Sequence, residues 1–262
     1  MSKVNLYIDC TNGISGDMFC RCLTELCGDI AFVESQQKLI SDELHHEEQH
    51  KHSHDHGHSH DHDHDHSQDH SHDHDNSHGN NLPKPYTDRS FQSILSLLSQ
   101  SGLDDKVKNM AQKIYTVLAK AEAHVHGETL ETVHFHEVGR PQAIINMVGI
   151  AAAYVATNPE HVYCSTIMDG TGTVLCAHGE ISVPVPAVSA LMETSDLSFA
   201  TKNVEMEMVT PTGLASLLAM EPIYMEFHAK EVQIIRTAQA KGERIRVDNE
   251  SAGGLKTVSF LF

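Results

Sequence analysis

Histidines crowd one segment of this chain. Residues 45–78 hold 15 of its 22 histidines, interleaved with Asp, Ser and Gly. Neutral imidazole binds nickel, copper, zinc and cobalt well, and alternate side chains of an extended H-x-H-x-H run can converge on one ion. The segment therefore predicts a tract that holds several divalent transition-metal ions in fast exchange, although composition alone does not choose among the metals. The candidate ligands are His52, His54, His56, His58, His60, His62, His64, His66, His70, His72 and His74.

The same tract is expected to lack a fold of its own. It contains almost no apolar residue, so it cannot bury enough surface to offset the entropy cost of ordering its backbone. We predict that residues 45–85 form an insertion and linker that are disordered without metal. They would separate a first unit at 1–44 from the rest of the main domain at 86–262. A passive, solubilising insert is the alternative to a metal-binding one.

A glycine-containing loop runs from Asp9 to Asp17, between a predicted strand and a predicted helix. Ligands commonly bind where a strand ends and a helix begins, because free backbone N–H groups at the helix start attract anions. Asp9 and Asp17 can instead hold a cation. A tight turn in which Asp17 caps the helix is the purely structural alternative.

Three further motifs carry candidate ligands. His134 and His136 would share one face of a strand, with Glu137 on the other face. Two histidines at this spacing supply half of a metal site or else serve as structural histidines. His178 lies in a short Cys-Ala-His-Gly segment. The hydroxyl-rich turn at 209–213 begins a predicted helix, where such turns bind phosphate or simply cap the helix.

Charge and the absence of targeting signals exclude some classes of function. The net charge of −18 would repel nucleic-acid phosphates and suits cations, so we expect no nucleic-acid partner. The chain has no run of 18 apolar residues and residues 1–12 are polar and mixed, so we expect neither a membrane span nor a secretory signal. The six cysteines are then expected to be reduced thiols in the cytoplasm.

These residues must be positioned by a fold that mixes helices and strands. Hydrophobic periodicity predicts a helix that Asp88 or Ser90 caps and Gly102 ends, together with helices at 18–26, 29–44, 104–124, 143–156, 187–194 and 211–220. Apolar alternation predicts strands at 3–9, 163–168, 171–176, 232–237 and 256–262. The combination is typical of an α+β fold, with a mixed α/β sheet and packed helices.

The motifs occur together and in order, and the set resembles the LarC family, the nickel-insertion proteins of nickel-pincer cofactor synthesis. The matching segments are residues 7–19, the His-rich insert, 120–139, 176–188 and 209–213. The resemblance implies insertion of nickel into pyridinium-3,5-bisthiocarboxylic acid mononucleotide. Family members do this in a CTP-dependent cyclometallation that forms one carbon–nickel and two sulfur–nickel bonds. The product serves lactate racemase and its relatives.

The resemblance also suggests roles for individual residues. The tract would gather Ni²⁺, while the ordered motifs would hold the nucleotide and position the metal. Predicted catalytic residues are Asp9, Cys10, Asp17, His136 and Glu137. Predicted ligand-binding residues are Ser15, Gly16, Thr210, Thr212 and Gly213. Predicted metal ligands outside the tract are His134, His136 and His178.

The chain departs from the family pattern at three places. Gln142 and Asn146 stand where the pattern usually has Asp, which removes two good ligands for Mg²⁺ or Mn²⁺. The family's glycine-rich stretch is only weakly matched at 237–242. The sequence given also stops at Phe262, before the C-terminal domain that the family associates with CTP. The chain is thus either one half of a two-part enzyme, with a separate C-terminal domain and an apo-racemase as partners, or a divergent paralogue acting as a nickel reservoir or metallochaperone.

Overall fold

The computed structural model describes residues 3–53, 89–176, 179–242 and 254–262, with backbone alone for 48–53. Its helices are α1 (Gly16–Cys27), α2 (Ile30–Ser53), α3 (Phe91–Gln100), α4 (Asp105–His126), α5 (Pro141–Thr157), α6 (Pro186–Glu193) and α7 (Pro211–Ala219). Its strands are β1 (Asn5–Asp9), β2 (Arg89–Ser90), β3 (His134–Phe135), β4 (Val162–Cys164), β5 (Ile167–Thr171), β6 (Thr173–Cys176), β7 (Gly179–Ser182), β8 (Phe199–Glu205), β9 (Ile223–Tyr224), β10 (Gln233–Ala240) and β11 (Leu255–Leu261). The predicted α+β class is confirmed.

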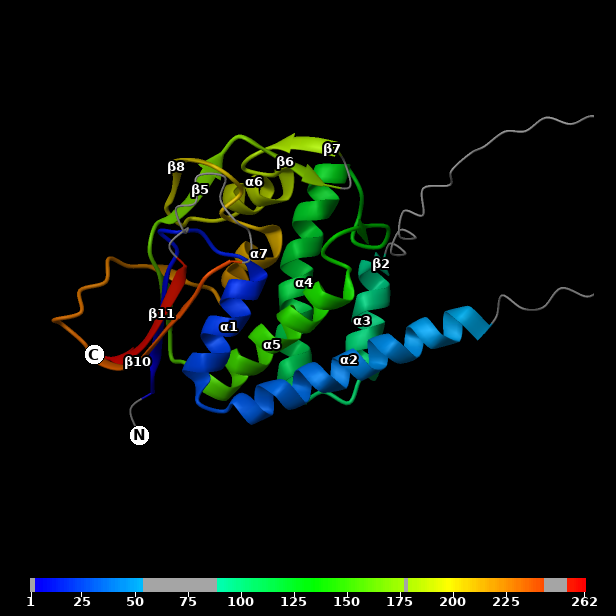
Figure 1. Ribbon diagram of the computed structural model, residues 1–262, viewed down its shortest axis with the longest axis horizontal. Coiled ribbons are helices and arrows are strands. Elements are labelled where there is room, and N and C mark those ends of the chain that lie inside the picture. The colour runs from blue at the N-terminus through cyan, green and yellow to red at the C-terminus, as the bar shows by residue number, and fades with distance from the viewer. Residues whose placement is uncertain (1–2, 54–88, 177–178, 243–253) are drawn as a thin grey trace, which may run out of the picture.

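The main sheet is mixed, with the strand order β10-β11-β1-β4-β9. β1 runs parallel to β4, β4 runs parallel to β9, and β11 runs antiparallel to both β1 and β10. Helix α1 packs against β10 and β11, and the other helices extend the structure away from the sheet (Figure 1). A second, smaller buried cluster forms on β1 and β11. In it, the rings of Tyr7 and Phe227 stack with centroids 4.6 Å apart.

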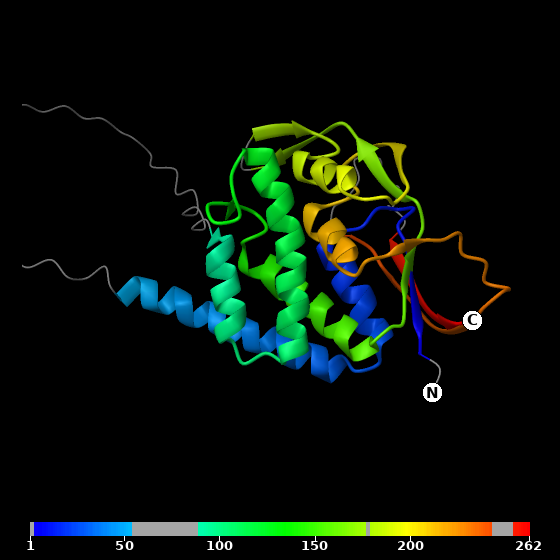
Figure 2. The same ribbon diagram turned by 180° about the vertical axis from the view of Figure 1, so that it is seen from behind.

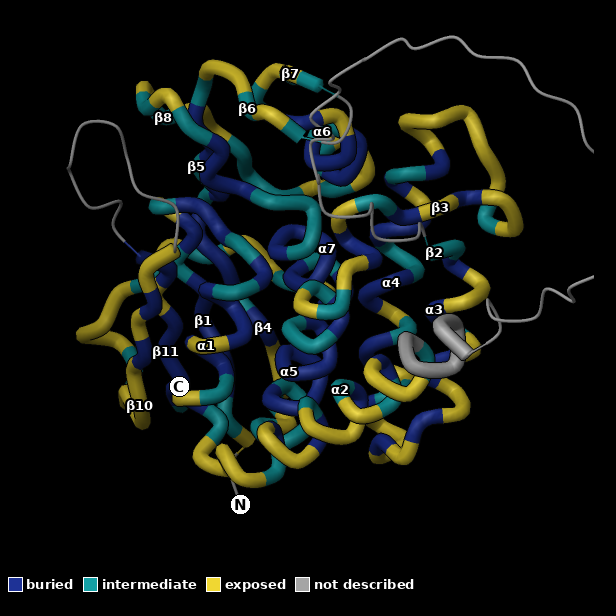
Figure 3. The backbone as a smooth tube through the Cα atoms, turned by 45° about the vertical axis from the view of Figure 1, so that its right-hand side comes forward, coloured by how far each residue is buried: buried dark blue, intermediate teal, exposed yellow. Residues whose placement is uncertain are grey.

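Helix α5 is the centre of the helical layer. It is apolar and rich in alanine, and α1, α2 and α4 pack around it (Figure 2). The buried backbone continues from α5 into α1, α4 and α7 as one core (Figure 3). A Cβ at Gly149 would lie 2.5 Å from the side-chain nitrogen of Gln37 and 2.6 Å from the Cys20 sulfur, so any larger residue there would force these side chains to move. Among the described residues, no helix is long and apolar enough to cross a membrane.

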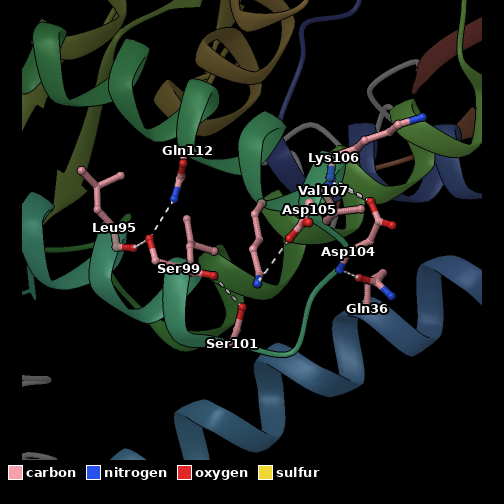
Figure 4. Close-up of polar contacts among 11 residues, drawn as sticks. Gln36, Leu95, Ser99, Ser101, Asp104, Asp105, Lys106, Val107 and Gln112 are labelled. Carbon is pink, nitrogen blue, oxygen red and sulfur yellow. Dashed lines mark hydrogen bonds and ion pairs between the residues drawn. The ribbon is translucent and has the colours of Figure 1, made fainter.

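The start of α4 shows how a local signal and a tertiary contact combine. The Asp104 carboxylate caps the helix by accepting hydrogen bonds from the backbone N–H groups of Lys106 at 2.8 Å and Val107 at 3.4 Å (Figure 4). The backbone N–H of Asp104 donates to the side-chain oxygen of Gln36 on α2, at 2.8 Å. The predicted helix at 104–124 is confirmed, and α2 fixes the turn that precedes it.

Several predicted boundaries move. Ser15, not Asp17, occupies the N-cap position of α1, and Asp17 lies in the first turn. The predicted strand at 163–168 divides into β4 and β5, which belong to different sheets because the chain leaves the main sheet between them. β7 and β8 were not predicted, since their apolar residues are too few to give an alternating pattern.

Helix α2 continues to Ser53, past the predicted start of the tract at His45. The reason is local, because residues 43–51 contain strong helix formers such as Glu, Gln and Lys, and Leu44 is buried. The predicted disorder of 54–85 falls on residues outside those that the structure describes.

Candidate functional site

The first candidate site lies where two parallel strands end. β1 ends at Asp9 and β4 ends at Cys164, so the loops that follow them leave the same edge of the sheet. The backbone N–H of Cys10 donates to the Ser165 hydroxyl at 2.8 Å, and the N–H of Met168 donates to the carbonyl of Cys10 at 3.1 Å. These bonds hold the two loops against each other.

A third loop joins them through backbone pairing. The N–H of Ile14 donates to the carbonyl of Met208 at 2.9 Å, and the N–H of Thr210 donates to the carbonyl of Ile14 at 3.0 Å. A Cβ at Gly213 would lie 2.6 Å from the Ile14 carbonyl oxygen, so only glycine permits this approach. The loop before α1 and the loop before α7 therefore form one structural unit, which we call the loop cluster (10–17, 165–170 and 206–213).

The loop cluster brings the five predicted ligand-binding residues together. A Cβ at Gly16 would lie 2.8 Å from the Thr212 hydroxyl, so the starts of α1 and α7 are in contact. The Thr210 hydroxyl caps α7 by accepting from the N–H of Gly213 at 3.2 Å and lies 3.0 Å from the Thr212 hydroxyl. Two helix N-termini thus lie together, and each carries the partial positive charge that favours an anion.

Charged side chains surround the loop cluster. Asp9 accepts hydrogen bonds from the N–H of Thr11 at 3.1 Å and from its hydroxyl at 2.6 Å. The Ser15 hydroxyl donates to Asp17 at 2.5 Å. The amine of Lys202 on β8 donates to the side-chain oxygen of Asn12 at 2.9 Å and adds a cation beside the loop. Sequence reasoning missed Lys202, because nothing in its own segment distinguishes it from a surface lysine.

Asp169 is the buried anchor of the loop cluster. It is 2% exposed, and one carboxylate oxygen accepts from the N–H groups of Gly170 at 2.8 Å, Met208 at 2.9 Å and Val209 at 3.0 Å. Its other oxygen is buried without a hydrogen-bond partner among the described residues. Burial raises the pKa of this carboxyl, and the three N–H donors oppose that rise. Asp169 was not predicted, although an Asp-Gly pair after an apolar strand was the available signal.

Cys10 is enclosed within the same cluster. Its side chain is 0% exposed, and burial, then Cys164 and Asp9, raise the pKa of the thiol well above its ordinary value. A neutral, enclosed thiol is a packing group rather than a nucleophile or a metal ligand. Its predicted catalytic role gains no support from this geometry and stays a prediction, as do those of Asp9 and Asp17.

The second candidate site lies at the C-terminal end of α4, where His136 follows the short strand β3; Figure 3 shows α4 and β3. β3 ends at Phe135, so His136 and Glu137 follow the strand rather than continue it. His134 is exposed, and Glu137 lies 3.9 Å from the Arg140 guanidinium. The ring of His136 lies 6.4 Å from the ring of His126, centroid to centroid. The structure therefore brings His136 to the end of α4 and away from the predicted catalytic residues of the loop cluster.

Glu122 completes this second group. Its carboxylate lies 3.6 Å from Nε2 of His126, one helical turn later on α4. Burial raises the pKa of Glu122, and His126 and His136 oppose that rise. Sequence reasoning missed Glu122 and His126, although an acid and a histidine four residues apart on a helix were the available signal. Within the described ranges, no three His, Cys, Asp or Glu side chains form a ready-made metal site.

Comparison with known proteins now adds to this geometry. Residues 6–249 match the family model for nickel insertion protein. The chain belongs to the nickel insertion protein family. The match includes the loop cluster and the group around His126, so both lie within the part of the chain that defines the family.

Two relatives carry the name pyridinium-3,5-bisthiocarboxylic acid mononucleotide nickel insertion protein. The relative from Acetivibrio thermocellus is 40% identical over 129 residues, which cover 49% of this chain and 32% of the relative. The relative from Staphylococcus saprophyticus is 31% identical over 215 residues, which cover 82% of this chain and 50% of the relative. The chain thus spans from a third to half of these relatives' length. No solved structure matches it.

In this member of the family, Gln142 and Asn146 lie one turn apart at the start of α5. The Gln142 amide donates to the Asn146 side-chain oxygen at 3.0 Å. The pair is therefore satisfied by itself, without the cation that two Asp residues would attract there. His178 and the tract from His54 to His74 lie outside the described residues, and His52 is described by its backbone alone.

Proposed function

We propose that this chain inserts Ni²⁺ into pyridinium-3,5-bisthiocarboxylic acid mononucleotide to make the nickel-pincer cofactor. The observation that carries the proposal is the family match over residues 6–249, together with the substrate named for two relatives. The reaction is redox-neutral. A ring C–H bond breaks, a carbon–nickel bond forms, the proton passes to a base, and the two thiocarboxylates each form a sulfur–nickel bond.

The loop cluster is the site that best suits this substrate. The mononucleotide carries a phosphate, and the contacting N-termini of α1 and α7 favour a bound anion. The half-buried hydroxyl of Thr212 can donate to a phosphate oxygen, and Lys202 supplies a positive charge beside the loop. In this assignment the cluster binds and orients the nucleotide, while Asp169 positions the loop.

Metal supply is assigned to the His-rich tract, which would gather Ni²⁺ and release it. CTP, with Mg²⁺ or Mn²⁺, would be bound by a C-terminal domain that acts with this chain. The product would be loaded into an apo-racemase of the lactate racemase type. The amide pair of Gln142 and Asn146 is consistent with this division, because it leaves no carboxylate on that turn of α5 to attract Mg²⁺ or Mn²⁺.

Activation of an apo-racemase tests the proposal. The purified chain is incubated with the thiolated mononucleotide, Ni²⁺, CTP and Mg²⁺ or Mn²⁺, with and without a C-terminal domain from a relative, and racemase activity is measured. Thr212→Val keeps the side-chain shape but removes the hydroxyl, and is expected to reduce activation about tenfold. Thr116→Val, on α4, is the matched control and should leave activation unchanged. No activation even with the added domain would contradict the proposal.

The second candidate function is a nickel reservoir or metallochaperone. The neutral pair of Gln142 and Asn146 favours it, since the charged ligands expected of an enzyme at that position are absent from this turn of α5. Removal of residues 54–81 separates the two functions. An enzyme supplied with excess Ni²⁺ keeps its turnover without the tract, whereas a reservoir loses nearly all of its nickel capacity and with it its function.

A further inference from the structure

Glu122, His126 and His136 form a compact set of metal-ligating side chains outside the loop cluster; we call it the acceptor group. Glu122 and His126 come from the last two turns of α4, and His136 comes from the turn after β3. The Glu122 side chain is 17% exposed and that of His126 is 30% exposed. The group is therefore partly buried but still accessible to solvent, as a site that exchanges its metal ion must be.

Both ends of the His-rich insertion are held on the side of the molecule where this group lies. The Arg89 guanidinium binds Glu47 near the end of α2 at 2.6 Å, and the Arg89 side chain is only 11% exposed. β2 pairs with β3 in the register Ser90 to His134 and Arg89 to Phe135. His136 is the next residue after Phe135, so β2, which follows the insertion, is paired with the strand that directly precedes His136.

We propose that Glu122, His126 and His136 form a transfer site that accepts one divalent transition-metal ion from the His-rich insertion. One carboxylate and two imidazoles are borderline donors that suit Ni²⁺, Co²⁺, Zn²⁺ and Cu²⁺. The fixed ends of the insertion make the exchange intramolecular, so the local concentration of donor ligands is set by the tether and not by the protein concentration. That the ion is nickel rests on the function proposed above.

The distances are close to those that a bound ion requires. Two donors about 2.1 Å from one ion, at angles of about 90–110°, lie about 3.0–3.4 Å apart. The separation of 3.6 Å between Glu122 and His126 needs a change of only a few tenths of an ångström. Two imidazoles on one tetrahedral ion have centroids about 5 Å apart. The ring of His136, at 6.4 Å, must approach His126 by roughly 1 Å, which side-chain rotation supplies.

An incomplete site suits transfer better than storage. The group supplies three ligands from the part of the chain that the structure describes, and a coordination position that they do not fill can take an incoming or outgoing ligand. The partly buried Glu122 carboxylate, 3.6 Å from Nε2 of His126, supplies negative charge that draws the cation inward. The acceptor group thus differs from the tract in holding one ion at one fixed position.

Nickel stoichiometry of the full-length chain tests this proposal. Equilibrium dialysis against Ni²⁺ alone, followed by metal analysis, gives the number of ions bound per chain. His126→Ala and His136→Ala are each expected to bind about one ion fewer than the unmodified chain. The double variant should lose the same single ion and not two. His161→Ala, an exposed histidine beside Tyr163, is the matched control and should lose none.

Unchanged stoichiometry in both single variants, or the loss of two ions in the double variant, would overturn the proposal. A second measurement is independent of variant folding, because paramagnetic Ni²⁺ should broaden the NMR ring signals of His126 and His136 but not that of His161 in the unmodified chain. Absence of that broadening counts against the site. Neither experiment contains nucleotide or CTP. A failure of the racemase-activation assay therefore does not affect the conclusion about metal binding, and a failure of metal binding does not decide the racemase-activation assay.

Discussion

The loop cluster and the acceptor group are built in different ways. The loop cluster is held by backbone hydrogen bonds, close glycine contacts and one buried carboxylate, Asp169. The acceptor group is held by side chains on a helix end and a turn, and its Glu122 carboxylate and His126 Nε2 lie 3.6 Å apart. A backbone-built site is rigid and suits a substrate of fixed shape, whereas a side-chain-built site can adjust to an ion that must leave again.

This contrast explains why one protein would separate metal handling from the chemistry. A site that binds Ni²⁺ tightly enough to gather it releases it slowly, because the dissociation rate falls as affinity rises. Placing the exchangeable ligands at the C-terminal end of α4 and the anion site at the N-termini of α1 and α7 lets each meet its own requirement. The following predictions test whether the two regions differ in this way.

The largest effect is expected at Gly13, in the loop cluster. Gly13 has φ +81°, and a Cβ there would lie 2.1 Å from the Met208 carbonyl oxygen. Gly13→Ala should therefore lower the free energy of unfolding by about 4 kcal/mol, because backbone strain and a backbone clash add. Gly127→Ala, at φ +66° but with nothing within 4 Å, should cost about 1 kcal/mol. Urea unfolding measures both, and equal losses would contradict a rigid loop cluster.

The next effect is expected at Asp169. Asp169→Ala removes the acceptor of three backbone N–H groups and should destabilise the fold by about 3 kcal/mol. Asp196→Ala, at an exposed position, is the control and should change the free energy of unfolding by less than about 0.5 kcal/mol. A small loss at Asp169 would show that other contacts hold the 208–209 backbone.

A smaller effect is expected at the base of the insertion. A double-mutant cycle of Glu47→Ala and Arg89→Ala should give a coupling energy of about 1 kcal/mol, since the pair is only partly exposed. Urea unfolding of the two single variants and the double variant gives this value. Zero coupling would mean that the pair does not close the insertion in solution, which would weaken the case for transfer to the acceptor group.

The smallest effect is a pH dependence. The pKa of Asp169 is raised in the folded protein above its ordinary value of 3.8, so the folded state binds this proton more tightly than the unfolded state does. Stability should therefore fall as the pH rises from about 4 through the folded-state pKa, relative to Asp169→Asn, which has no such proton. Urea unfolding of both proteins across this range checks the sign, and parallel curves would contradict it.

Helices were the most predictable part of the fold. The limits of α4 follow from Asp104 at its start and Gly127 at its end, because capping bonds form within a few residues. A strand at His134 was predicted, but the two-residue strand β2 that pairs with it was not, since so short a strand is defined by its partner rather than by its own pattern. The chain leaves the main sheet between β4 and β5, and this was not predicted either, because it depends on which strands pair and not on the local pattern.

The candidate site was predictable as separate pieces. The sequence alone indicated a metal-binding chain, an anion-binding loop before α1 and another before α7, because residue types carry their chemistry wherever they lie. Only the tertiary structure decided which pieces meet. The pairing of Ile14 with Val209 unites the two loops, and the packing of β3 near the end of α4 gives His136 its neighbours Glu122 and His126. Such contacts join segments far apart along the chain, and their energies depend on the whole core that brings them together.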